Sequence, residues 1–426
     1  MPPVQAAVDS KDAAVKSRRS GPPRGFLGLR TGCDPRLLHV HRRCRGRHRA
    51  SDCSCLLPHR HAPPLLRAAR DGREVQVTRL KVRVGIAGVG NSASTFIQGL
   101  RHYGSGKTIE GLWHPRVGGL SVGDIEVVAA FDIDSRKVGL DLSEAIFAKP
   151  NVGRKYLEVP KMGVEVQPGL SRGDLPPHLS SEKLSLSTTE RVSKELATSG
   201  VTILLNLISS GTPRSSLDYA NAAAEAGCSF VNCTPNILVS RPTLAKKFSK
   251  AKLCLAGDDL MSQFGGTIFH KGLLSLMVKR GIRISKSYQL DVGGGSETFN
   301  TIDEEIKVAK RKLKTSSVAQ EVPYQFETVA GTTDYVDYMG NERTSYFWFD
   351  GSTFLNSRVG VDVYLRSSDG ANAGNVLLDV IRALSTARES RVYGAVGEVC
   401  AYGFKSPPRR VNFEEAYASF KSRFLR

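Results

Sequence analysis

The sequence predicts an α/β protein in which a Rossmann-like, doubly wound parallel sheet carries an inserted α+β domain with a mainly antiparallel sheet. Three observations predict this fold class. A β-branched strand pattern at residues 82–86 runs into a glycine-rich turn that opens a helix. Further apolar strand patterns alternate with helical ones as far as residue 256, which is typical of a parallel sheet. After residue 263 the pattern changes to longer helices and several separate strands.

The turn after the first predicted strand has the pattern of a dinucleotide-binding loop. Residues 88–93 read Gly-Val-Gly-Asn-Ser-Ala. Gly88 permits the tight turn, Gly90 lets the backbone approach a pyrophosphate, and Ala93 allows the helix to pack closely on the strand. Asn91 and Ser92 lie at the start of the helix, whose free N–H groups and positive dipole suit phosphates.

The second predicted strand, residues 125–134, ends in acidic residues. An acid at this place binds the ribose hydroxyls of the cofactor, and Asp132 comes later than usual because residues 102–124 look like an inserted loop. Its carboxylate favours NAD over NADP, since it repels a 2′-phosphate. Glycines that serve packing alone are the alternative. Because strand, glycines, helix and acid occur in order, we favour NAD binding.

The remaining elements of the first domain follow in alternation. We expect a helix at 137–147, a surface excursion at 150–187, strands at 201–208, 228–233 and 253–256, and helices at 217–226 and near Leu244. Ligands bind at the carboxyl ends of such strands. The predicted cofactor-binding residues at these ends are Ser209, Ser210, Gly211 and Asp258.

The second domain is predicted to interrupt the first. It has helices at 267–280 and 298–314 and strands at 282–292, 324–329, 346–350 and 358–366. The last strand alternates apolar and polar residues, so one of its faces is covered. A helix at 373–387 then returns to the first sheet. The predicted domains are 81–260 with 370–426, and the insertion at 261–369.

Residues 1–80 form a basic leader that accounts for much of the protein's charge. Their net charge is +11, against +8 for the remainder and +19 overall. Because they hold no sustained hydrophobic period, we expect disorder, or a start of translation nearer Val77 or Val82. Their Cys and His residues lack paired C-x-x-C units, so no metal site is predicted. The arginines at 41–49 suit nonspecific nucleic-acid binding, but we do not expect that partner.

The composition of the remaining chain favours a cytoplasmic protein without a membrane anchor. No stretch of about 18 residues is apolar enough to span a bilayer. The cysteines after the leader lie in apolar contexts and are expected to be buried reduced thiols. They are Cys228, Cys233, Cys254 and Cys400.

Lysines are the candidate chemical groups, because the chain has no recognised nucleophile motif. Lys307, Lys310 and Lys314 lie on one stripe of a predicted helix, where like charges repel unless an anion lies between them. The glycine-rich residues 293–298 precede this helix and suit a phosphate. The alternatives are a solvated helix face and a flexible turn. Lys405 lies in a rigid loop before two prolines.

These motifs, in this order, resemble the myo-inositol-1-phosphate synthase (inositol-3-phosphate synthase) family of the archaeal and bacterial type. The resemblance runs from about Val82 to Pro408. The matching stretches are residues 84–94, 131–134, 137–147, 257–263, 288–294, 310–315, 369–372 and 405–408.

The resemblance implies a redox-neutral isomerisation of D-glucose 6-phosphate to 1D-myo-inositol 3-phosphate, the first step of inositol and inositol-phospholipid biosynthesis. Bound NAD would oxidise C5, C6 would lose a proton, the enolate would close on the C1 aldehyde, and the ketone would be reduced. The family also implies a homotetramer built through the inserted domain, with a divalent or monovalent cation as a further cofactor in some members.

The resemblance also implies roles for individual residues. The predicted catalytic residues are Lys314, Lys405, Lys310 and Asp259. Further cofactor-binding residues are Asp369 and Asn372. The predicted substrate-binding residues are Gly294, Gly295, Ser296, Asn300 and Lys271.

The chain departs from the family at a lysine position, which Met261 occupies here. Arg343 or Lys271 would then replace the missing charge, or the enzyme would be weak or altered. Two other functions therefore stay open. One is a conventional NAD-linked dehydrogenase of another phosphorylated metabolite, and the other is a catalytically impaired NAD-binding homologue.

Overall fold

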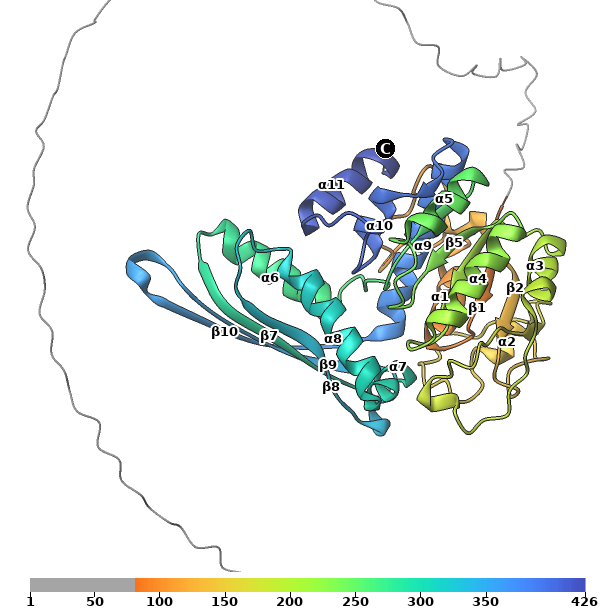
Figure 1. The fold of residues 1–426 in the computed structure, drawn as a ribbon, viewed down its shortest axis with the longest axis horizontal. Helices are drawn as coiled ribbons and strands as arrows, with labels where there is room; N and C mark the ends of the chain where they lie inside the picture. The colour runs from red at the N-terminus through yellow and green to blue at the C-terminus, as the bar shows by residue number, and fades with distance from the viewer. Residues whose placement is uncertain (1–80, 426) are drawn as a thin grey trace, which may run out of the picture. The chain divides into compact units, whose positions relative to one another are not determined.

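The computed structural model describes residues 81–425, all of which belong to one compact unit, Val75–Arg426. The expectations for the basic leader, residues 1–80, lie outside the described residues. Two hydrophobic cores organise the described part, one around a large parallel sheet and one around a smaller sheet (Figure 1). The predicted fold class is confirmed, whereas the exact domain boundaries stay a prediction.

The large sheet has seven strands in the order β11-β6-β5-β4-β1-β2-β3, and every neighbouring pair is parallel. Its strands are short and apolar and are buried on both faces, as parallel strands between helices are. They are β1 (Val82–Ala87), β2 (Ile125–Asp132), β3 (Val166–Pro168), β4 (Ile203–Asn206), β5 (Ser229–Asn232), β6 (Cys254–Ala256) and β11 (Gly394–Ala395).

The chain reverses its direction of winding between β1 and β4, which lie side by side at the centre of the sheet. This switch point leaves a crevice at the carboxyl ends of the two strands, where such sheets bind ligands. The helices that belong with the sheet are α1 (Asn91–Tyr103), α2 (Leu142–Ala145), α3 (Thr189–Thr198), α4 (Pro213–Glu225), α5 (Pro242–Lys250), α9 (Asp369–Glu389), α10 (Gly397–Gly403) and α11 (Phe413–Phe424).

The smaller sheet has four strands in the order β10-β9-β7-β8. Helices α6 and α8 cover one of its faces (Figure 1). The pairs β10–β9 and β7–β9 are antiparallel as predicted, but β7–β8 is parallel, because α8 lies between the two strands in the chain. The elements are α6 (Gly266–Lys279), β7 (Arg283–Gly293), α7 (Ser296–Phe299), α8 (Glu304–Ala319), β8 (Glu327–Tyr335), β9 (Glu342–Ser352) and β10 (Arg358–Ser368).

Two predicted helices differ from the expectation. At 137–147 only α2 forms, because Gly139 has a φ of +87° and Asp141 then caps a new helix by accepting from Ser143 N–H. The helix predicted at 298–314 is split, and α8 starts after Asp303, whose side chain accepts from Ile306 N–H. The 3₁₀ helices are η1 (Val122–Asp124), η2 (Pro177–Leu179), η3 (Asn300–Ile302), η4 (Asp337–Met339) and η5 (Phe354–Asn356).

Some elements were not predicted. The excursion at 150–187 contributes β3 to the edge of the large sheet, and α3 follows it. The C-terminal elements β11, α10 and α11 also escaped the sequence analysis. Across residues 81–425, every helix falls short of the length and apolarity that crossing a bilayer requires.

Candidate active site

Hydrogen bonds hold the glycine turn between β1 and α1 from both sides. Gly88 has a φ of +93°, and an added Cβ would lie 2.7 Å from the backbone nitrogen of Ile208, so only glycine fits. The N–H of Val89 donates to the Asp132 carboxylate at 2.7 Å, and its carbonyl accepts from Lys137 Nζ at 2.8 Å. These bonds give the turn one fixed shape.

Gly90 is the glycine of this turn that faces open space. A Cβ added there meets no atom within 4 Å. Gly90 is also the N-cap of α1, so the positive end of a 13-residue helix begins at this point. An anion can therefore approach the backbone closely here, as a pyrophosphate does in dinucleotide-binding folds.

A cavity lies beside the turn, over the carboxyl ends of β1, β2 and β4. Its wall includes Gly88, Gly90 and Asp132, while the excursion supplies His178 and Leu179. The excursion therefore covers the part of the crevice in which a doubly wound sheet holds the ribose and base of a nucleotide.

A wider cleft continues from this cavity towards the smaller sheet. Gly90, Ile208 and Ser209 line both the cavity and the cleft, so the two spaces adjoin at the glycine turn and the loop after β4. Basic side chains from one helix, one strand and one loop face this cleft. They are Lys310, Lys314, Arg343 and Lys405.

Lys314 on α8 is buried and pairs with Asp291 on β7, with Nζ 2.5 Å from Oδ2. Asp291 also accepts hydrogen bonds from Ser345 Oγ at 2.6 Å and Gln289 Nε2 at 2.8 Å. Burial alone would raise the pKa of Asp291, but Lys314 and Arg343 bring it well below its usual range. Burial lowers the pKa of Lys314, and the Asp291 carboxylate opposes this change.

Lys405 reaches the cleft from the loop after α10. Its Nζ lies 2.7 Å from Asp259 Oδ1 and donates to the carbonyl of Leu260 at 2.9 Å. The backbone N–H of Lys405 also donates to the carbonyl of Asp259, so the two loops are tied together. Asp259 thereby fixes the position of the Lys405 ammonium group.

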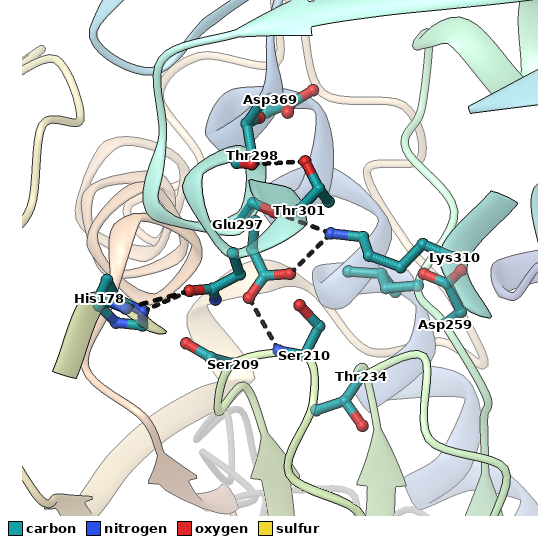
Figure 2. A network of polar contacts seen from close by, with 12 residues as sticks. His178, Ser209, Ser210, Thr234, Asp259, Glu297, Thr298, Thr301, Lys310 and Asp369 are labelled. Atoms are coloured by element: carbon teal, nitrogen blue, oxygen red, sulfur yellow. Dashed lines mark hydrogen bonds and ion pairs between the residues drawn. The ribbon is translucent and has the colours of Figure 1, made fainter. Parts of the chain in front are cut away.

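Lys310 on α8 pairs with Glu297 on α7 at 3.0 Å (Figure 2). The other oxygen of Glu297 accepts from Ser210 N–H at 2.9 Å, on the loop after β4. Burial would raise the pKa of Glu297, but Lys310 and the Ser210 N–H lower it to about 2. Glu297, which lies next to the smaller sheet, thus holds the loop that follows β4 of the large sheet.

Arg343 on β9 joins the two regions at another point. Its Nη2 lies 2.6 Å from Asp369 Oδ2, at the start of α9, and its Nη1 lies 3.6 Å from Asp291 Oδ2. Its Nε is buried and has no hydrogen-bond partner among the described residues. Arg343 therefore ties the start of α9 to the Asp291–Lys314 pair.

The cleft can stabilise negative charge that develops on a bound substrate. Each of its four basic residues pairs with a carboxylate, so it holds fixed ammonium and guanidinium groups without a large net charge. Fixed cations in a partly buried site stabilise oxyanions much better than cations in water do. Within residues 81–425, no group of three or more His, Cys, Asp or Glu side chains is arranged to hold a metal ion.

Comparison with known proteins identifies the family. The family model described as myo-inositol-1-phosphate synthase matches residues 265–370. The inositol-3-phosphate synthase of Corynebacterium glutamicum is 34% identical over 343 residues, which cover 78% of this chain and 94% of that one. The chain belongs to the myo-inositol-1-phosphate synthase family.

Two solved structures share the fold of this synthase-family chain. The crystal structure of Ari2 is 31% identical, with a TM-score of 0.65, and the match covers 80% of this chain and 98% of that one. A myo-inositol-1-phosphate synthase-related protein from Thermotoga maritima is 22% identical, with a TM-score of 0.67 and the same coverage of both chains.

Most of the residues predicted from the family motifs gather around these two adjoining spaces. Gly88 and Asp132 line the cavity. The cleft is lined by Gly90, Asn91, Ser92, Ser209, Asp259, Gly295, Ser296, Lys310, Lys314, Asp369 and Lys405. Ala93 is buried, Ser210 contributes the N–H that binds Glu297, and Gly211 packs against Ile306.

Asp258 is corrected: it is completely buried and lines neither space. Its carboxylate accepts from Asn232 Nδ2 at 2.6 Å and from the N–H groups of Leu238 and Val239. Burial raises its pKa to about 7. Asp258 therefore stabilises the loop between β5 and α5 instead of contacting a cofactor.

Four other predicted residues also lie away from the cleft wall. Asn372 faces a separate cavity between α1 and α9, and Gly294 packs under the β8–β9 turn. Asn300 is buried, and its side-chain oxygen bonds to His178 at 2.9 Å. Lys271 pairs with Glu321 at 3.1 Å behind the cleft, beside Met261.

Several residues that shape the site had no role predicted from the sequence. Asp291 and Glu297 hold two of the lysines, while Lys137 and Asn151 hold the glycine turn. An acidic residue at a core position of a strand was the available signal for Asp291. Lys137 and Asn151 carry no such signal, because their contacts depend on how the excursion folds back.

Proposed function

We propose that the protein converts D-glucose 6-phosphate into 1D-myo-inositol 3-phosphate with NAD as its retained cofactor. One observation carries this proposal: the glycine turn and the ammonium groups of Lys314 and Lys405 open onto one continuous cleft. A reaction that oxidises and later reduces the same sugar needs its cofactor and its charge-stabilising groups side by side throughout.

The residues around the turn fit NAD. The open space at Gly90 and the start of α1 suit a pyrophosphate, and Asp132 lies where a ribose would. When bound, NAD supplies a hydride acceptor and later returns the hydride. Asp132, next to the turn through Val89, favours a ribose with a free 2′-hydroxyl.

The basic residues divide the remaining work. Lys314 and Lys405 hold positive charge where oxygen atoms of the sugar become negative during oxidation, enolisation and ring closure. Each can also pass a proton to or from such an oxygen. Lys310 lines the same cleft and suits the substrate phosphate.

Arg343 is our candidate for the charge that Met261 does not supply. Arg343 lines the cleft, whereas Lys271, the other candidate, is held by Glu321 behind it. A guanidinium cannot give up its proton, so it substitutes for the charge of a lysine but not for proton transfer. Proton transfer then rests on Lys314 and Lys405.

We also propose a homotetramer assembled through the smaller sheet. The face that α6 and α8 leave uncovered carries an aromatic row in which Tyr288 stacks on Trp348 and Tyr346 contacts Tyr364. Tyr364 is 73% exposed. Exposed apolar faces of this kind are typical of protein interfaces. The cytoplasmic location and the cation stay predictions, and nucleic acid and membranes are not among the proposed partners.

Product analysis of the full-length protein with NAD and glucose 6-phosphate tests the function. The synthase produces inositol monophosphate without accumulating NADH. A conventional dehydrogenase would accumulate NADH in proportion to the sugar consumed, and an impaired homologue would bind NAD without forming either product.

A further inference from the structure

A row of polar side chains crosses the apolar core of the smaller sheet. Ser287, Gln289 and Asp291 alternate along β7, so all three face the same side of the sheet. Each is at most 4% exposed. Their neighbours in this core are apolar, among them Phe347 and Phe349. Burying polar groups in such a place costs free energy unless every group is bonded, so this departure from an apolar pattern points to function.

The row is bonded without interruption from the cleft to β8. Asp291 holds Lys314 and accepts from Gln289 Nε2 at 2.8 Å. Gln289 Oε1 lies 3.3 Å from Nδ1 of His270 on α6. His270 Nε2 lies 2.9 Å from Ser287 Oγ, which lies 2.8 Å from the hydroxyl of Thr328.

The charge of Asp291 sets the direction of every bond in this row. Because the Gln289 amide donates to a carboxylate, its oxygen must accept from His270, so Nδ1 of His270 carries the proton. Nε2 then accepts from Ser287, which in turn accepts from Thr328. All donors thus point towards Asp291, and such aligned bonds strengthen one another. Burial lowers the pKa of His270 to about 4, which keeps the ring neutral, as this arrangement requires.

The backbone of α6 locks the amide in place. A Cβ added at Gly266 would lie 2.2 Å from Gln289 Nε2 and 3.0 Å from Ser345 Oγ. The first turn of α6 therefore closes on the two groups that bond to Asp291. His270 is fixed in the same way by edge contacts with the rings of Phe347 and Phe349.

We propose that Gln289 and His270 are positioning residues for the reaction, which act on Lys314 through Asp291. They hold the carboxylate in one orientation, and the carboxylate holds the Lys314 ammonium group towards the cleft. The inference rests on the proposed function, because it gives Lys314 its role in turnover. It predicts that changes two side chains away from the substrate reduce kcat and leave KM nearly unchanged.

The variant Gln289→Met tests this role, because it removes the amide and keeps a side chain of similar length. We expect kcat for glucose 6-phosphate to fall roughly 10- to 100-fold, since a small displacement of a charge-stabilising group has effects of this size. Leu274→Ala is the matched control: it opens the same core on α6 and removes no hydrogen bond of the polar row. Its kcat should stay within about twofold of the parent. Equal losses of kcat in the two variants would show that the polar row has only a structural role, which would overturn the proposal.

The variant Gln289→Glu adds a readout that packing alone does not move. Its protonated carboxyl can donate to Asp291 and accept from His270, whereas its ionised form places a second negative charge against Asp291. Lys314, Arg343 and His270 are the other titratable groups that face it. We expect near-parental kcat at low pH and a new loss of activity as pH rises. The same pH profile as the parent would overturn the proposal.

A chemical readout separates this inference from the proposed function. Acetylation of Lys314 by acetic anhydride, followed by peptide mass spectrometry, requires no turnover. Lys314 should react several-fold faster in Gln289→Met than in the parent, and at the parental rate in Leu274→Ala. If the parent fails to convert glucose 6-phosphate, the proposed function fails while this result still tests the row. Unchanged labelling in Gln289→Met would overturn the inference.

Discussion

The two sheets of this protein form their shared site in different ways. The large parallel sheet and its loops contribute a glycine turn, a helix start and loop N–H groups over an apolar core, together with the Lys405–Asp259 ion pair. The smaller sheet contributes charged side chains, and it keeps a polar row inside its own core to hold them. A site built from backbone groups can be predicted from a short sequence motif. A site built from side chains depends on residues that the fold brings together from several elements.

The largest expected effect comes from removing a charged side chain of the cleft. Lys314→Met should reduce kcat by roughly 10³-fold or more, because it removes a cation from the cleft and leaves Asp291 buried without its closest partner. Affinity for NAD should stay near that of the parent. Steady-state kinetics and calorimetric titration with NAD measure the two quantities. Lys405→Met should behave in the same way, and parental turnover in either variant would remove that lysine from the mechanism.

The backbone contribution to cofactor binding is tested by comparing substitutions of Gly90 and Gly88. Gly90→Val should weaken NAD binding about 100-fold with little change in thermal stability, since its side chain fills only the open space used by the cofactor. Gly88→Ala should lower stability as well, because it forces a positive φ and a backbone clash. NAD titration and thermal unfolding distinguish the two. Equal effects of both variants would contradict the account.

A change to Arg343, which links the smaller sheet to the start of α9, should have a smaller effect. Arg343→Lys should lower kcat by about 10-fold, because an ammonium group cannot reach both Asp291 and Asp369 as a guanidinium does. Arg358→Lys is the control, since Arg358 pairs with Asp350 at an exposed site away from the cleft. A loss of the same size in both variants would show that the effect is not specific to the cleft.

One further prediction concerns protein stability and leaves turnover aside. The pKa of His270 is lowered by burial from 6.5 to about 4 in the folded protein. Between these two pH values His270 is protonated in the unfolded chain but stays neutral in the folded protein. The free energy of unfolding is therefore unaffected by this group above pH 6.5 and falls as the pH is lowered towards 4. This group contributes a loss of about 3 kcal/mol over that interval. Denaturant unfolding should show a smaller acid loss for His270→Gln, and an identical loss would contradict a buried neutral imidazole.

The contrast between backbone and side-chain contributions also explains which parts of the site could be predicted from the sequence. The glycine turn, Asp132, and the lysines at 310, 314 and 405 were predicted from local motifs or from family motifs, and all of them line the cavity or the cleft. Asp258 was misplaced because a strand end in the sequence does not reveal whether its side chain faces a cleft or a loop. Asn372 was misplaced for a similar reason: the start of α9 presents Asp369 to the cleft and Asn372 to a different cavity.

The pairings inside the smaller sheet could not be predicted. His270 lies in a helix and Gln289 in a strand 19 residues later, and only the packing of α6 on β7 brings them together. The same holds for Asp291 and Lys314, which are 23 residues apart. Alternation along β7 placed these residues on one face, but it gave no sign that the face was a buried core with polar members.

The central claim is that cofactor and lysines share one cleft, so that a hydride taken from the sugar returns to the same molecule. Turnover of glucose 6-phosphate deuterated at C5 tests this most directly. We expect inositol monophosphate that retains the deuterium, with no net formation of NADH. Loss of the label from the product, or accumulation of deuterated NADH, would contradict it.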